Sequence, residues 1–79
     1  MTASDDELRR MAECEALAEK AYNEMYETRF PAGLYSEMKD CFIEAIGAAR
    51  RAGRPDEVER LTRRLENCKQ VYRKQFATF

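Results

Sequence analysis

The chain has 79 residues, no histidine and a net charge of −1, and 44% of its residues are hydrophobic and 37% charged. A chain of this length forms one small domain, here residues 1–79, and buries only about 60% of the surface of its unfolded chain. Three glycines and two prolines are too few for the many turns of a β-sandwich, so we predict an all-α protein.

The first predicted helix spans about residues 5–28. Ser4 and Glu7 have the spacing of a capping box, which indicates a helix N-terminus. Apolar residues then recur at intervals of three and four, the period of an amphipathic helix, at Met11, Cys14, Ala18, Ala21 and Met25. Pro31 pushes the preceding residue out of helical geometry, so we expect the helix to end before it.

The second and third helices are predicted at about residues 34–52 and 55–77. The apolar side of the second helix is rich in alanine, whose side chain is small, so a neighbouring helix can approach it closely. Gly53 suits the position just after a helix, and Pro55 suits the first turn of the next. Because both connections are short, consecutive helices must be antiparallel, which predicts a three-helix up-down-up antiparallel bundle.

The four tyrosines and four phenylalanines fall in two windows that this topology brings to one end of the bundle. The windows hold Tyr22, Tyr26, Phe30, Tyr35 and Phe42, and then Tyr72, Phe76 and Phe79. Aromatic rings fill core volume, and this packing role accounts for most of them. Those at helix edges, in the loop or at the terminus, with basic neighbours, have the composition of a protein interface. The predicted partner-binding residues are Tyr26, Phe30, Tyr35, Phe76, Phe79, Arg73 and Lys74.

Charge is divided along the chain. Residues 1–49 carry 11 acidic and 5 basic side chains, whereas residues 50–79 carry 4 and 9. Mutual attraction between neighbouring helices is the simplest explanation. The alternative is a basic stripe that contacts the phosphates of a nucleic acid, through Arg50, Arg51, Arg54, Arg60, Arg63 and Lys74. The negative total charge and the interleaved glutamates make nucleic acid the weaker of the two hypotheses.

The composition argues against an enzyme. Without histidine the chain lacks the commonest general base and metal ligand, and its isolated glycines form no phosphate-binding loop. Cys14, Cys41 and Cys68 lie one per predicted helix, and we expect them to be small buried hydrophobic residues. We therefore expect no catalytic residue, no metal site and no cofactor.

The odd number of cysteines and the acidic start without an apolar run indicate a cytoplasmic protein with free thiols. No stretch is apolar for the length that a membrane span requires, so we expect no membrane association.

The stretch from Ile46 to Val58 resembles the helix–turn–helix of a tetratricopeptide repeat, with Gly47 in the first helix and Gly53 at the turn. The interval between these glycines is one residue shorter than in that family, and no second repeat follows. The resemblance implies a helical hairpin and does not assign the family.

Together these observations predict a non-enzymatic helical protein-interaction module, acting as an adaptor, chaperone-like or regulatory protein. Its contact surface would be the aromatic-rich end of the bundle. The partner is an unknown protein, and a second copy of the chain is one candidate, because an acidic and a basic helix are also complementary between molecules.

Overall fold

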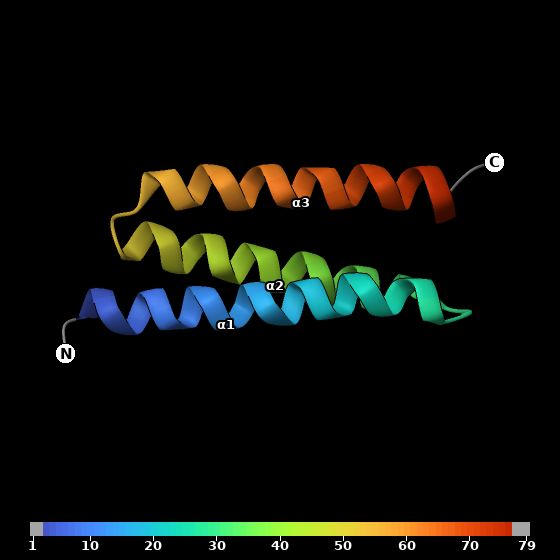
Figure 1. The fold of residues 1–79 in the computed structure, drawn as a ribbon, viewed down its shortest axis with the longest axis horizontal. Helices are drawn as coiled ribbons and strands as arrows, with labels where there is room; N and C mark the ends of the chain where they lie inside the picture. Colours follow the sequence, from blue (N-terminus) through green and yellow to red (C-terminus); the bar gives the residue numbers. More distant parts are fainter. Residues whose placement is uncertain (1–2, 77–79) are drawn as a thin grey trace.

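Three helices lie side by side along the long axis of the molecule (Figure 1). The computed structural model describes the backbone of residues 3–76 and the side chains of residues 5–75. The elements are α1 (Ala3–Glu24), the 3₁₀ turn η1 (Met25–Glu27), α2 (Pro31–Arg51) and α3 (Pro55–Phe76). No strand occurs within residues 3–76, and consecutive helices are antiparallel, which confirms the predicted all-α three-helix bundle.

α1 differs from its sequence prediction at both ends. It already includes Ala3, so Ser4 lies inside the helix and the predicted capping box is wrong. The carboxylate of Glu7 instead accepts a hydrogen bond of 2.9 Å from Nε of Arg51, at the end of α2. At its other end the α-helix stops at Glu24 and tightens into η1, a common ending for the last turn of a helix.

α2 begins at Pro31, three residues before the predicted start at position 34. The fixed φ of proline suits the first position of a helix, where its missing N–H would have no intrahelical partner. Phe30 is the N-cap residue, with φ −126° and ψ 73°. Its backbone N–H donates a 3.2 Å hydrogen bond to Oγ1 of Thr28. Pro31 therefore separates the two helices by starting the second.

The connection from α2 to α3 is a Schellman motif centred on Gly53. Gly53 has φ +70°, a left-handed conformation that glycine adopts without steric cost. Its N–H donates to the carbonyl oxygen of Arg50 and that of Arg54 donates to the carbonyl oxygen of Ala49, both at 3.0 Å. Pro55 then starts α3. Gly53 and Pro55 therefore form the turn that the sequence predicts, and this short turn makes α2 and α3 a helical hairpin.

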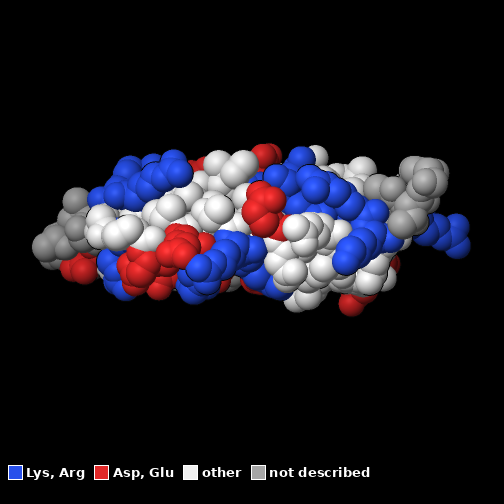
Figure 2. Space-filling model, turned by 90° about the horizontal axis from the view of Figure 1, so that it is seen from above, with Lys and Arg blue, Asp and Glu red and all other residues white. Residues whose placement is uncertain are grey.

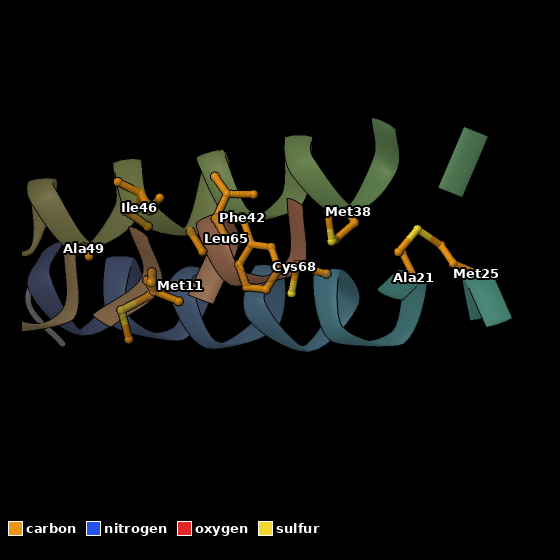
Figure 3. Close-up of a cluster of buried hydrophobic side chains, with 13 residues drawn as sticks. Met11, Ala21, Met25, Met38, Phe42, Ile46, Ala49, Leu65 and Cys68 are labelled. Carbon is orange, nitrogen blue, oxygen red and sulfur yellow. The ribbon is translucent and has the colours of Figure 1, made fainter. Parts of the chain in front are cut away.

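Small side chains bring α1 and α2 close together. Five alanines are fully or almost fully buried in the core: Ala18, Ala21, Ala45, Ala48 and Ala49. Phe42 in the middle of α2 is the largest fully buried side chain, and Figure 3 shows its ring between the helices. α3 contributes Leu61, Leu65 and Cys68 to the same cluster. The backbones of α1 and α2 are therefore close together over more of their length than those of α2 and α3.

α1 and α3 approach each other less closely than either approaches α2, and long side chains span the gap between them. Arg60 forms two hydrogen bonds of 2.7 and 2.9 Å to the carboxylate of Glu15. Arg64 forms two, of 2.6 and 2.7 Å, to that of Glu19, one helical turn further along. The attraction between the acidic first helix and the basic third helix is therefore satisfied within one molecule.

We expect Ala45→Leu to destabilise the protein by about 1–3 kcal/mol, because no space for a larger side chain exists at a fully buried alanine. Urea unfolding followed by circular dichroism measures this change. Ala16→Leu is the matched control, since Ala16 is exposed on α1, and it should change stability by less than about 0.5 kcal/mol. Equal effects of the two substitutions would contradict close packing at Ala45.

The stability that Glu15 contributes should disappear in acid. Its hydrogen bond with Arg60 holds the pKa of Glu15 below its ordinary value of 4.5. A lowered pKa stabilises the folded state above the unfolded-state pKa, and this contribution is lost as the pH falls through the folded-state value. The wild type should exceed Glu15→Gln in stability at pH 7, by less than about 1 kcal/mol because the pair is partly exposed.

That difference should shrink as the pH falls below 4.5, as measured by urea unfolding at each pH. Glu13→Gln removes the same charge from α1 without breaking an ion pair, and is the control. A Glu15→Gln difference that persists unchanged at pH 2.5 would exclude the ion pair as its cause.

Candidate functional site

Part of the predicted aromatic cluster lies at the end of the bundle where α1 stops, α2 starts and α3 finishes. The prediction was wrong for Phe42, which is buried in the core in the middle of α2. We call this cluster the aromatic end, and its described members are Tyr22, Tyr26, Phe30, Tyr35 and Tyr72. The Cα atoms extend 47 × 19 × 13 Å, so the cross-section at this end is small. A surface this narrow cannot enclose every ring.

Tyr22 and Tyr26 form an edge-to-face pair on successive turns at the end of α1. Their ring centroids are 5.6 Å apart with an interplanar angle of 89°, and their hydroxyl oxygens are 3.1 Å apart. This hydrogen bond, together with burial, raises the pKa of Tyr22 to about 12. The guanidinium of Arg64 lies 5.1 Å from the centroid of the Tyr22 ring, which ties the pair to α3.

Tyr35 and Tyr72 join the start of α2 to the end of α3. Their rings are stacked, with centroids 3.8 Å apart and planes within 6° of parallel. Nζ of Lys39 lies 4.6 Å from the centroid of the Tyr35 ring, close enough for a cation–π interaction. Half-buried Tyr35, one of the predicted partner-binding residues, thus already has two internal contacts and holds α3 in place.

Two aromatic side chains at this end are left open to solvent. Tyr26 is 46% exposed and Phe30 is 83% exposed, and we call this pair the aromatic rim. The predicted Arg73 and Lys74 are also exposed, in the last turn of α3. The side chain of Phe76 and the whole of Phe79 lie outside the described residues. The rim is therefore the part of the predicted site that the structure leaves available to a partner.

Most of the basic side chains that were predicted to contact nucleic acid are paired with carboxylates of the same molecule. The pairs are Arg51 with Glu7, Arg54 with Asp56, Arg60 with Glu15 and Glu57, and Arg63 with Glu59. Among the side chains that the structure describes, only Arg50 and Lys74 of the predicted set make no ion pair. Figure 2 views the molecule from the α3 side, where basic patches are interrupted by acidic and neutral side chains. No continuous basic surface follows α3.

A hollow that the sequence did not predict lies at the turn between α2 and α3, opposite the aromatic end. It has a volume of about 300 Å³ and is lined by Arg50, Gly53, Arg54, Pro55 and Val58. The guanidinium of Arg54 is held there by two hydrogen bonds to the carboxylate of Asp56, at 3.1 and 2.9 Å. The Schellman turn creates this hollow, since Gly53 has no side chain to fill it.

The three cysteines behave as apolar side chains. Cys68 is fully buried, whereas Cys14 and Cys41 are half-buried at the edge of the core. Burial is the main cause that raises the pKa of all three thiols above its ordinary value, so they stay protonated at neutral pH. Within the described residues no three cysteine or acidic side chains are placed to hold a metal ion.

Comparison with protein-family models, with curated proteins and with solved structures finds no match to this chain. No helix within residues 3–76 combines the length and the apolar character that are needed to cross a bilayer.

Proposed function

We propose that this protein is a non-enzymatic helical interaction module that binds another protein through its aromatic rim. Tyr26 and Phe30, with Arg73 and Lys74 near the end of α3, form the contact surface. The observation that carries this proposal is the 83% exposure of Phe30, a large apolar ring held at the tip of the molecule.

The backbone on both sides of Phe30 is held by local interactions, which fix the position of the ring. Its N–H is bonded to Thr28, and Pro31 fixes the first turn of α2 immediately after it. A side chain on a preorganised backbone binds with a smaller loss of conformational entropy than one on a flexible loop. Tyr26 adds a second ring, already oriented by its contact with Tyr22. Aromatic anchors of this kind dominate the binding energy of many protein interfaces.

The other functional classes find less support. A nucleic acid would have to displace the carboxylates that already pair with Arg51, Arg54, Arg60 and Arg63. The charges of α1 and α3 meet within one molecule, so charge complementarity no longer favours a homodimer. Within residues 5–75 no charged or polar side chain is buried, and solvated carboxylates make poor acid–base catalysts.

Phe30→Ser should abolish partner binding without weakening the fold. Phe30 is the N-cap residue of α2, and serine is a favourable N-cap, so stability should be unchanged or rise by up to about 1 kcal/mol. Binding is measured by quantitative affinity purification from cells that express the protein, with the substituted chain as bait. Thermal unfolding of the same preparations measures stability.

Ile43→Ser is the matched control, because Ile43 is 59% exposed on α2 and lies outside the aromatic end. It should retain the partner that Phe30→Ser loses. The partner should also remain bound at 0.5 M salt, since an apolar contact is weakly screened whereas phosphate contacts weaken steeply. Recovery of the same proteins with both variants, or recovery only of nucleic acid at low salt, would contradict the proposal.

A further inference from the structure

A second unpartnered surface runs along the side of α1 and α2 that faces away from α3. Leu17 on α1 is 54% exposed there. It lies two residues from both Glu15 and Glu19, which bond to α3, so it points about 200° around the helix from them. A hollow of about 90 Å³ beside it is lined by Leu17, Lys20, Ala21, Glu24 and Glu37.

The apolar side chains of this surface are Leu17, which lines the hollow, and half-buried Cys14 and Cys41, which lie at the edge of the core and do not line the hollow. We call these three side chains the apolar floor. Glu37 comes from α2, two residues after Tyr35, which packs against α3, and this spacing places Glu37 on the side away from α3. We call the surface between Leu17 and Glu37, with the two cysteines, the α1–α2 groove.

The walls of the α1–α2 groove are acidic, and their carboxylates outnumber the basic groups beside them. Among the side chains that the structure describes, five carboxylates near the groove make no ion pair: Glu13, Glu24, Glu37, Asp40 and Glu44. Glu24 and Glu37 line the hollow, and Glu37, Asp40 and Glu44 are close enough to Cys41 to raise the pKa of its thiol. Glu13 and Glu44 act in the same way on Cys14.

Few basic groups balance these carboxylates. Lys20 lines the hollow and Arg10 lies near Cys14, while Arg51, also near Cys14, is already paired with Glu7. On the opposite side of the molecule, by contrast, carboxylates of α1 and α3 are paired with arginines or with Lys69, as in the pair of Glu19 with Arg64. The uncompensated negative charge of α1 and α2 is therefore concentrated beside the apolar floor.

A second copy of the chain does not complement this surface. Two copies related by a twofold axis through the groove would bring acidic walls against acidic walls, which is repulsive. The outward side of α3 is more basic but polar, with Arg63, Asn67, Gln70 and Lys74 exposed. Among its described side chains it offers no exposed large apolar residue to cover Leu17. The occupant must combine an apolar stripe with positive flanks.

We propose that the α1–α2 groove binds a basic amphipathic helix of another protein, which packs along α1 and α2 as a fourth helix. Its apolar stripe covers Leu17, and lysines or arginines on its flanks pair with Glu24 and Glu37 and with Glu13 and Glu44. The groove residues from 13 to 24 span about 17 Å of α1, so the bound helix has about three turns. This site is independent of the aromatic rim.

The test uses the full chain and a labelled synthetic helix of leucine and lysine, with leucines at i, i+3, i+4 and i+7, titrated by fluorescence anisotropy. Leu17→Ser should weaken binding about tenfold, because it removes the exposed large apolar side chain of the floor. The double variant Glu24→Gln/Glu37→Gln should weaken it to a similar degree and should flatten its salt dependence. All these side chains are at least partly exposed, and circular dichroism checks that the variants stay folded.

Two controls match these variants elsewhere on the surface. Ile43→Ser removes an equally exposed apolar residue, and Glu59→Gln/Glu66→Gln on α3 makes the same change in net charge. Both should bind the peptide within about twofold of the wild type, because they lie outside the groove. Phe30→Ser should also bind normally, which separates this surface from the aromatic rim.

Three results would overturn the proposal. The first is unchanged affinity in Leu17→Ser. The second is equal weakening by both double variants, which would mean that the peptide responds only to total charge. The third is loss of binding in Phe30→Ser, which would place the peptide on the aromatic end.

Discussion

Buried alanines at the contact between α1 and α2 set the spacing on which the rest of the molecule depends. With only methyl groups at Ala18, Ala21, Ala45 and Ala48, these two helices can approach closely and form the most closely packed pair of the bundle. α3 cannot approach α1 as closely, because Phe42 and the leucines of α3 fill the space between the helices. Long arginine side chains and the stack of Tyr35 on Tyr72 complete its attachment.

This asymmetry explains how charge is distributed. The acidic side of α1 that faces α3 is neutralised by Arg60 and Arg64, and the basic character of α3 is used for the same purpose. The side of α1 and α2 that faces away from α3 has no basic helix beside it, and Glu24 and Glu37 form no ion pair there next to exposed Leu17. The two proposed surfaces differ accordingly: the aromatic rim is a small apolar tip, whereas the α1–α2 groove is long and acidic.

Local sequence signals were sufficient for the fold and for part of the aromatic site. Gly53 and Pro55 marked a turn that the structure forms in the expected way, because their backbone restrictions act whatever surrounds them. Pro31 marked the right place but was assigned to the end of one helix instead of the start of the next. Arg60 was assigned to a basic stripe that could contact nucleic acid, whereas its side chain reaches across to Glu15, a contact that depends on the distance between helices. Leu17 is a large apolar residue outside the apolar stripe of its helix, and this position was the sequence signal for an exposed apolar side chain on α1.

The sequence by itself determined that this chain forms three helices, each antiparallel to the next, and that Tyr22, Tyr26, Phe30, Tyr35 and Tyr72 lie at one end. Helical periodicity, turn residues and connection length are local properties, and they leave a short helical chain little choice of topology. Only the tertiary structure decided which charges are paired, which rings are stacked and which apolar side chains stay exposed. Those outcomes depend on helix spacing and rotation. Shifts of a few ångströms decide whether an arginine is paired or free, and whether a ring is half-buried like Tyr35 or exposed like Phe30.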